Sequence, residues 1–309
     1  MHPFWRHADY VSLTMEFRCN LACTHCMIEG TMDWLQPQGL AQFEQVLAAR
    51  ERQGWTGLIL TGSEITLLKD LPRLAERARA AGFRHVRIQT HGMHLDKPGF
   101  LARLVGAGVD EFFISVAAGC AETHDRITKV PGSFARTLAG LEALEAHDVI
   151  SLTNTVLTTE CYRELPQMVQ ALGHLRRLRQ MEFWNFFPMR ETDDKGLIVP
   201  LAALLPPLRQ AAHLAMAAGR RVEIKNVPVC ALGEDGGLVA NGQPQLFIDP
   251  RFWDQFARNG FHQCRHRSVC AAQHCLGLTT AYIASYGPEE ALLAPLPPCA
   301  SPQLQQVSA

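Results

Sequence analysis

The chain has 309 residues, 47% of them hydrophobic, and a formal net charge of −1. This length suits one large α/β domain with a small appendage, and the near-zero charge gives no reason to expect a nucleic-acid or membrane partner. No apolar run approaches the roughly 18 residues of a membrane span, and the N-terminus has no signal-peptide core, so we expect a soluble cytoplasmic protein with reduced cysteines.

Short β-rich runs alternate with amphipathic helical stretches from residue 11 to about residue 228. Strands are predicted at residues 11–17, 57–62, 85–90, 111–116, 151–158 and 180–187. Between strands, apolar residues recur at helical spacing, as at Phe134, Leu138 and Leu141. This alternation is typical of βα units around a parallel sheet. It predicts an α/β fold, a partial (β/α)6 TIM barrel, whose functional side chains gather at the C-terminal ends of the strands.

The pattern changes after a further predicted helix at 201–219 and an apolar, strand-like stretch at 221–228. Residues 230–290 carry turns rich in glycine and asparagine and a second set of cysteines, which indicates a small cysteine-rich C-terminal domain. Prolines and polar residues dominate the tail. We therefore predict a barrel at 1–228, the cysteine-rich domain at 229–290 and a flexible tail at 291–309.

Three cysteines lie directly after the first predicted strand. They are Cys19, Cys23 and Cys26, with the spacing C-x3-C-x2-C. Thiolates from such short runs hold iron-sulfur clusters, so this loop can bind three irons of a 4Fe-4S cube. No fourth cysteine is near in sequence, which leaves one iron open to a chelating ligand. Zinc bound by Cys23, Cys26 and His25, or a disulfide framework, are the alternatives.

With this spacing and position, the sequence resembles the radical S-adenosylmethionine (radical SAM) enzymes. The resemblance implies that the open iron binds the amino and carboxylate groups of SAM. It also implies that the reduced cluster cleaves SAM to a 5'-deoxyadenosyl radical, which abstracts hydrogen from the substrate. The electron would come from an external donor such as flavodoxin or ferredoxin.

The residues after the second predicted strand resemble the family's Gly-Gly-Glu-Pro element, which meets the SAM amino group. Gly62 allows a close backbone approach to a ligand, and Glu64 offers an acceptor for an ammonium group. Ser63 stands where the family has its second glycine, and Ile65 where it has proline. The structural alternative is a strand-to-helix turn with a capping carboxylate.

Two weaker matches lie on later strands. Ser115 belongs to a strand that resembles the family's ribose-facing strand, and Asn154 sits where polar contacts to SAM are often found. The family's usual acidic residue near position 117 is Ala117 here. Buried polar side chains that satisfy nearby backbone groups are the alternative.

His91 and Cys120 follow the third and fourth predicted strands, at the expected open face. In a radical enzyme, a thiol there can return a hydrogen atom to a substrate radical, and a histidine can take up a proton. We therefore predict catalytic roles for both. The alternatives are small apolar filler for Cys120, as for Cys161, and a plain loop side chain for His91.

The second set of cysteines comprises Cys230, Cys264, Cys270 and Cys275. It looks like the SPASM and twitch extensions of radical SAM enzymes, which hold auxiliary clusters, although a full SPASM domain uses seven cysteines. We expect one auxiliary 4Fe-4S cluster, with three or four cysteine ligands. Structural zinc is the alternative, and a nearby histidine can replace a thiolate. Cys299, in the tail, is expected to bind no metal.

A basic stretch accompanies this second set, with arginines at 251, 258, 265 and 267. It can attract an anionic substrate or raise the potential of a nearby cluster. A solvated basic face is the alternative.

The resemblance leaves the substrate open, and we favour a peptide or amino-acid side chain that is crosslinked, oxidised or epimerised. About ten residues precede the first strand, so a leader peptide would need a separate recognition protein or the C-terminal domain. The tail lacks a terminal Gly-Gly and no N-terminal extension is present, which disfavours a molybdopterin-type cyclase and cobalamin-dependent methyl transfer. The alternatives are a small-molecule dehydrogenase or cyclase, and a non-catalytic iron-sulfur or zinc protein.

Overall fold

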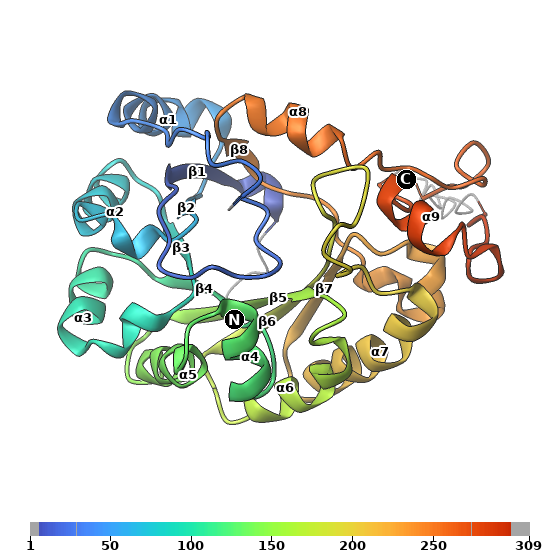
Figure 1. The fold of residues 1–309 in the computed structure, drawn as a ribbon. Helices are drawn as coiled ribbons and strands as arrows, with labels where there is room; N and C mark the ends of the chain where they lie inside the picture. The colour runs from blue at the N-terminus through green and yellow to red at the C-terminus, as the bar shows by residue number, and fades with distance from the viewer. Residues whose placement is uncertain (1–5, 29, 273, 298–309) are drawn as a thin grey trace, which may run out of the picture.

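The computed structural model describes residues 6–28, 30–272 and 274–297. Within these ranges, eight strands form one parallel sheet in the order β7-β6-β5-β4-β3-β2-β1-β8. Their bounds are β1 Tyr10–Glu16, β2 Gly57–Gly62, β3 His85–Thr90, β4 Glu111–Ser115, β5 Ile150–Leu157, β6 Leu178–Asn185, β7 Arg221–Lys225 and β8 Gln245–Phe247. The sheet curls into an incomplete barrel with helices around its outside (Figure 1). The predicted α/β partial barrel is confirmed.

The first seven helices of the described residues lie in the connections between successive strands, and the last two follow β8. They are α1 Leu40–Gln53, α2 Leu71–Ala80, α3 Pro98–Gly106, α4 Ala121–Thr128, α5 Ser133–Leu144, α6 Leu165–Ala171, α7 Leu201–Ala217, α8 Arg251–Ala257 and α9 Thr280–Tyr286. Short 3-10 turns add η1 His7–Asp9, η2 Ile65–Leu67, η3 Met93–Asp96, η4 Tyr162–Glu164, η5 Val229–Leu238 and η6 Glu290–Leu292.

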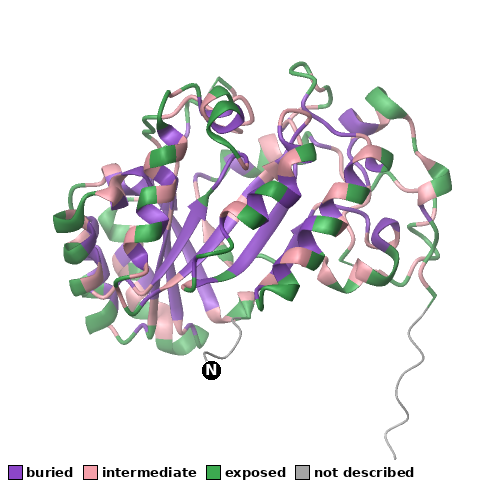
Figure 2. Cartoon of the chain, turned by 90° about the horizontal axis from the view of Figure 1, so that it is seen from below, coloured by how far each residue is buried: buried purple, intermediate pink, exposed green. Residues whose placement is uncertain are grey.

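The main core lies between the sheet and the helices that surround it. In α2 the buried residues Leu71, Leu74, Ala75 and Ala78 follow the spacing of one helical face. Figure 2 shows this distribution of burial, with buried strands at the centre and exposed residues on the outer sides of the helices. Among the residues described, none of the helices is long and apolar enough to cross a membrane.

Strand positions agree with the sequence prediction for β1 to β6, with differences of one or two residues at the ends. The predicted helix at 201–219 and strand-like stretch at 221–228 correspond to α7 and β7. The prediction of six strands was incomplete, because β8 was missed. Its three residues pair with β1 through Val11↔Gln245 and Leu13↔Phe247. Residues 245–247 therefore join the barrel sheet, although we assigned them to the C-terminal domain.

Paired charges are buried on the strands of the sheet. Glu111 is fully buried and accepts hydrogen bonds from Tyr10 Oη at 2.7 Å and from Arg87 Nε at 2.8 Å. Lys225, also buried, lies 3.0 Å from Glu223 Oε2 and donates to the carbonyl of Ala240 at 2.6 Å. Both pairs satisfy each other within the protein, and the C-terminal ends of the strands are where functional side chains gather in barrels of this kind.

Candidate active site

Residues 18–28, which we call the cysteine loop, leave the C-terminal end of β1 and cross the mouth of the barrel (Figure 1). Two backbone hydrogen bonds attach the loop to the far side. Ala22 N–H donates to Thr128 O at 3.1 Å, and Thr24 N–H donates to Ile127 O at 2.9 Å, both at the end of α4. The loop is therefore held at its start by β1 and in its middle by α4.

Two thiols of the cysteine loop, those of Cys19 and Cys26, lie close enough for the charge of one to act on the other. Cys26 N–H donates to Cys23 O at 3.0 Å and closes a turn, while Leu21 N–H donates to Cys19 Sγ at 3.4 Å. The pKa of the Cys19 thiol is raised to about 11, chiefly by burial; the negative charges of Glu64 and Cys26 act in the same direction, and the Leu21 hydrogen bond opposes them. Metal binding displaces the proton from such a thiol.

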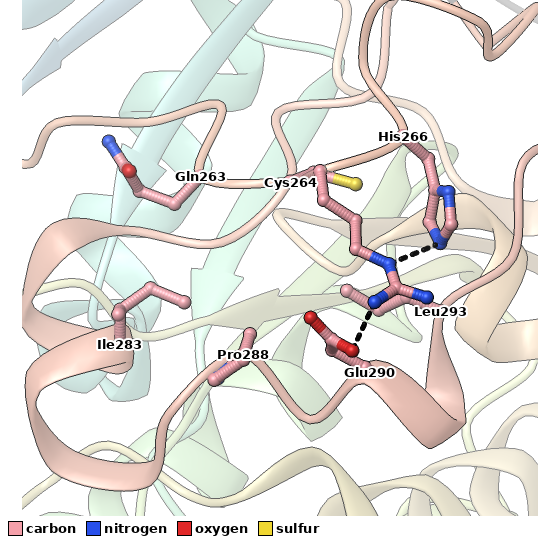
Figure 3. A pocket seen from close by; sticks show the side chains of 8 residues that line it. Gln263, Cys264, His266, Ile283, Pro288, Glu290 and Leu293 are labelled. Atoms are coloured by element: carbon pink, nitrogen blue, oxygen red, sulfur yellow. Dashed lines mark hydrogen bonds and ion pairs between the residues drawn. The ribbon is translucent and has the colours of Figure 1, made fainter.

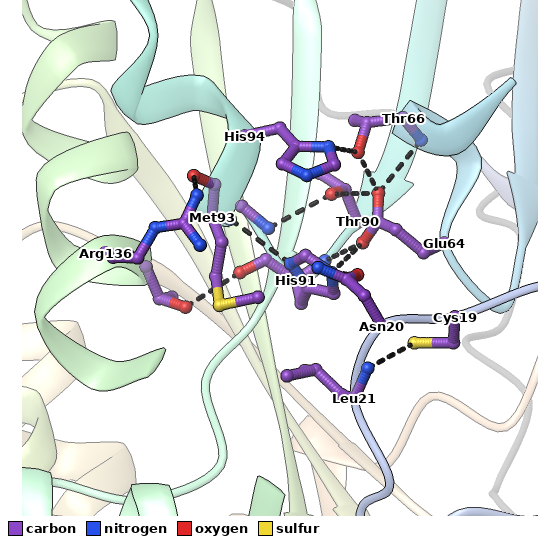
Figure 4. Close-up of polar contacts among 12 residues, drawn as sticks. Cys19, Asn20, Leu21, Glu64, Thr66, Thr90, His91, Met93, His94 and Arg136 are labelled. Carbon is purple, nitrogen blue, oxygen red and sulfur yellow. Dashed lines mark hydrogen bonds and ion pairs between the residues drawn. The ribbon is translucent and has the colours of Figure 1, made fainter. Parts of the chain in front are cut away.

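Glu64 lies directly after β2 and is fully buried. Its Oε1 accepts hydrogen bonds from Thr66 N at 2.9 Å, Thr66 Oγ1 at 2.5 Å and Thr90 Oγ1 at 2.6 Å. Its Oε2 accepts from His91 N at 2.9 Å and lies 2.9 Å from His91 Nε2 (Figure 4). Burial favours a raised pKa, but contacts with His91, Thr66 and Thr90 outweigh it and lower the pKa to about 2. The carboxylate is therefore ionised and surrounded by protein donors.

Gly62 is required by the sheet itself. A Cβ there would lie 1.8 Å from the carbonyl oxygen of Glu16. Ser63 N–H donates to that same oxygen at 2.8 Å. We predicted a close backbone approach at Gly62, and the structure has one: the group that approaches is the backbone of β1. Next to it, Ser63 Oγ is buried and has no hydrogen-bond partner among the residues that the structure describes.

Ser115 and Asn154 are directly opposite each other on β4 and β5. Ser115 Oγ donates to Asn154 Oδ1 at 2.8 Å, and the Ser115 residue is exposed at the end of its strand. The structure therefore brings these two predicted residues together at the strand ends. Both keep a predicted role as SAM contacts.

The His91 ring is 6% exposed and contacts protein groups through both nitrogens. Nδ1 accepts from Met93 N–H at 3.2 Å, so the ring proton lies on Nε2. Nε2 lies 2.7 Å from Asn20 Oδ1 and 2.9 Å from Glu64 Oε2. A base in proton transfer needs a nitrogen within reach of the substrate, whereas these contacts favour a supporting role. Proton transfer by His91 stays a prediction.

Cys120 immediately precedes α4 and is exposed. Its thiol lies 3.5 Å from Glu164 Oε2, and Thr123 Oγ1 donates to the other oxygen of Glu164 at 2.5 Å. The thiol therefore has a carboxylate neighbour, and its role as a hydrogen-atom donor stays a prediction. Cys161, in contrast, is 2% exposed and packs in a small apolar cluster with Ala117, Ala118 and Ile127.

The other three cysteines of the second set lie within electrostatic range of Cys230, although in the described part of the chain no three His, Cys, Asp or Glu side chains are arranged as a metal-ligand group. Burial raises the pKa of the Cys230 thiol, and the charges of the other three, Cys275, Cys264 and Cys270, raise it further. Backbone amides approach two of the sulfurs, with Gly277 N–H 3.4 Å from Cys275 Sγ and Leu296 N–H 3.3 Å from Cys270 Sγ. Cys299 lies outside the described residues.

A cavity of about 200 Å³ adjoins the second set at Cys264. Arg265 and Glu290 form an ion pair on its wall, and Arg265 Nε is 3.4 Å from His266 Nε2 (Figure 3). The remaining lining comes from Gln263, Ile283, Pro288 and Leu293. The cavity is small, and its charged residues pair with each other.

Three of the four arginines of the basic stretch pair with carboxylates, and Arg267 donates to the Cys275 carbonyl. Arg251 contacts Asp249 at 2.6 Å, and Arg258 contacts Glu191 at 2.8 Å. This pairing offsets the positive charge, which favours the solvated-face interpretation over attraction of an anionic substrate. The neighbouring aromatic residues help to cover a second apolar core of Met32, Leu35, Met189 and Phe252, packed by Phe17, Met27, Ile28, Phe187, Ile248 and Phe256.

Sequence reasoning missed the residues that support the predicted site. Asn20, Thr66 and Thr90 each contact Glu64 or His91 in the folded protein. Asn20 carried one signal, because it lies between two cysteines of the motif. Thr66 lies two residues from Glu64, which caps η2, so its contact is local. Thr90 gave no sequence signal, since only the adjacency of β2 and β3 places its hydroxyl on the Glu64 carboxylate.

Comparison with known proteins defines the class. A model of the Radical SAM superfamily matches residues 15–172, which is half of the chain. The chain therefore belongs to the radical SAM superfamily, whose members use a 4Fe-4S cluster and S-adenosylmethionine.

Relatives within this superfamily have several activities. The chain is 30% identical over 176 residues to a probable GTP 3',8-cyclase of Methanopyrus kandleri, which is 56% of each protein. It is 30% identical over 187 residues to an AdoMet-dependent heme synthase of Methanosarcina barkeri, covering 59% of this chain and 52% of that protein. The chain thus spans about half the length of these curated relatives.

Solved structures share the fold at low sequence identity. Streptococcus suis SuiB bound to its precursor peptide SuiA superimposes with a TM-score of 0.59 at 14% identity, covering 73% of this chain and 50% of SuiB. Native anSMEcpe with bound AdoMet gives a TM-score of 0.55 at 16% identity, covering 70% and 63%. At this identity the likeness concerns the fold alone.

Proposed function

We propose that Cys19, Cys23 and Cys26 hold a 4Fe-4S cluster, on which the protein cleaves SAM reductively and abstracts hydrogen from a substrate. One observation carries this proposal: the three thiols share one loop that lies over the C-terminal ends of a parallel sheet. When bound, the cluster and SAM supply the electron transfer and the carbon radical. The residues of the chain hold the thiolates, orient SAM and cover the barrel mouth.

The residues at the strand ends suit a bound SAM molecule in different ways. Ser63 Oγ, buried without a partner in the described part of the chain, offers a contact for a ligand beside the cysteine loop. Ser115 and Asn154 provide a hydroxyl and an amide side by side. Gly62 shapes the end of β2, and Glu64 supports the surrounding backbone through His91 and Thr66. We therefore assign Ser63, Ser115 and Asn154 to direct contact and the other two to support.

The second set of cysteines is proposed to bind one auxiliary 4Fe-4S cluster. The charges of Cys264, Cys270 and Cys275 all act on Cys230, so the four sulfurs share one neighbourhood. Amide N–H groups beside Cys270 and Cys275 favour charged sulfur ligands. Such a cluster would carry electrons in an oxidoreductase or hold the C-terminal region together.

The substrate that we propose is a peptide or amino-acid side chain, which the enzyme crosslinks, oxidises or epimerises. A separate peptide-recognition protein would then serve as a partner, together with an external electron donor. A small molecule is the second candidate, and a specific observation favours it. The relatives at 30% identity are named as a GTP cyclase and a heme synthase.

Anaerobic reconstitution with iron and sulfide tests the proposal. Wild type should bind iron and, with SAM and a reductant, form 5'-deoxyadenosine. The triple variant Cys19→Ala, Cys23→Ala, Cys26→Ala should form none. A filled cluster without 5'-deoxyadenosine would favour the non-catalytic alternative, and zinc in place of iron would remove the radical mechanism.

Deuterium transfer separates the two substrate classes. Candidate peptides or small molecules that carry deuterium at the reacting carbon should yield deuterated 5'-deoxyadenosine only where they are substrates. The same assay tests Cys120. If its thiol returns the hydrogen atom, Cys120→Ala should still form 5'-deoxyadenosine but should lose the product hydrogen that derives from solvent.

A further inference from the structure

The Glu64 carboxylate uses its acceptor capacity within the protein. An ionised carboxylate offers about four lone-pair sites. Thr66 N, Thr66 Oγ1 and Thr90 Oγ1 occupy Oε1, while His91 N and Nε2 face Oε2. Because the side chain is also 0% exposed, a ligand ammonium group could reach it only by displacing these donors. Glu64 is therefore in a position to organise the protein around it.

His91 joins this carboxylate to the cysteine loop. Its Nε2–H faces Asn20 Oδ1 at 2.7 Å as well as Glu64 Oε2 at 2.9 Å (Figure 4). Asn20 follows Cys19 directly, and the next amide, Leu21 N–H, donates to Cys19 Sγ. Two consecutive residues thus connect the sulfur of Cys19 to the His91 ring.

The His91 residue is itself firmly fixed. Thr137 Oγ1 of α5 donates to His91 O at 2.9 Å, and Met93 N–H donates to the ring Nδ1. Gly140 of α5 packs so closely on Gly92 that a Cβ there would lie 2.3 Å from Gly92 O. The contacts with α5 therefore fix the His91 backbone, and the Met93 amide fixes its ring, which gives the loop a defined contact.

We propose that His91 is a positioning residue, which uses Glu64 as its anchor and Asn20 as its contact to fix the Cys19 end of the cysteine loop. This inference rests on the proposed function, since it gives the loop its role as cluster holder. It differs from proton transfer, because both ring nitrogens serve protein contacts.

Amide hydrogen exchange on the iron-free protein, without SAM, tests the proposal. The reporters are the amides of Leu21, Ala22, Thr24 and Cys26, which are hydrogen-bonded in the loop. Asn20→Ala and His91→Ala should each accelerate exchange within residues 18–28 by about tenfold, the effect of one lost hydrogen bond of this kind. Exchange in the double variant should be only slightly faster than in His91→Ala, because both changes remove the same contact.

His174→Ala is the control. His174 is a half-exposed histidine whose ring contacts Glu142 Oε1 at 3.1 Å and Ala171 O at 3.1 Å, outside the network of Glu64 and His91. This variant should leave exchange in residues 18–28 at the wild-type rate. Asn20 is exposed, so Asn20→Ala tests the contact without opening the core, even if His91→Ala fails to fold. Wild-type exchange of the loop in Asn20→Ala would overturn the proposal.

A second readout separates positioning from proton transfer. In reconstituted protein, His91→Gln keeps an N–H donor but has no ring to titrate. A positioning role predicts iron loss to a chelator close to the wild-type rate in His91→Gln, about tenfold faster loss in His91→Ala, and an unchanged pH profile of SAM cleavage in His91→Gln. If the rise or the fall of SAM cleavage with pH disappeared in His91→Gln, the proposal would be overturned. If wild type fills its cluster but forms no 5'-deoxyadenosine, the proposed function fails, whereas the exchange result still decides the role of His91.

Discussion

Replacing Gly62 with alanine should destabilise the protein before any ligand binds. The new Cβ would lie 1.8 Å from Glu16 O and 2.8 Å from the attached carbonyl carbon. Both contacts are with backbone, so no flexible side chain can move aside. The ends of β1 and β2 would have to separate, which would also break the hydrogen bond from Ser63 N–H to Glu16 O.

The size of the effect follows from these two losses. Over-packing a closely packed position costs about 1–3 kcal/mol, and the lost hydrogen bond adds about 1 kcal/mol. We therefore expect the free energy of unfolding to fall by roughly 2–4 kcal/mol. Urea unfolding of the iron-free protein, followed by circular dichroism, measures it.

Gly106→Ala is the matched control for this measurement. Gly106 is the last residue of α3, and a Cβ there meets no atom within 4 Å. Alanine is also the better helix former, so this variant should be as stable as wild type or slightly more stable. If Gly62 serves only ligand approach, Gly62→Ala would unfold like Gly106→Ala and lose SAM affinity alone. Equal urea midpoints for the two variants would refute the reasoning.

Three further predictions concern buried charge and the second set of cysteines. The pKa of Glu64 falls from 4.5 to about 2 on folding, because its contacts with His91, Thr66 and Thr90 outweigh burial. Its stabilisation, on the order of 3 kcal/mol, is therefore complete above the unfolded pKa and is lost as the pH falls through the folded pKa. Glu64→Gln should flatten the fall in stability over that acid range in a urea series, and an unchanged slope would contradict this. Lys225→Ala should cost about 3–5 kcal/mol, because Glu223 and Glu182 then remain buried without the Lys225 ammonium, which lies 3.0 and 3.8 Å from them. Adding Glu223→Gln to Lys225→Ala should recover part of that loss, measured as the urea midpoint. If the two substitutions instead lowered stability additively, the pairing of Lys225 with Glu223 would be contradicted. Cys264→Ala should lower reconstituted iron from about eight to about four atoms per chain, and an unchanged iron count would show that the cluster does not need Cys264.

Most of the barrel could be predicted because its signals are local. The strands β1 to β6 are short buried runs, and the helices between them repeat apolar residues at helical spacing. β8 has only three residues, so it shows no periodicity, and its pairing with β1 depends on the chain returning from the other edge of the sheet. The second set of cysteines was visible in the sequence, but only folding brings Cys230 near the other three.

By itself the sequence determined which chemistry is available, because three cysteines at fixed spacing on one loop carry that information locally. Only the tertiary structure decided which polar groups remain available for a ligand. Glu64, the strongest candidate in the sequence after the cysteines, is enclosed by donors from β3 and η2, whereas Ser63 Oγ has no partner among the described residues. Hydrogen-bond saturation depends on groups far apart in the chain, so no local pattern can reveal it.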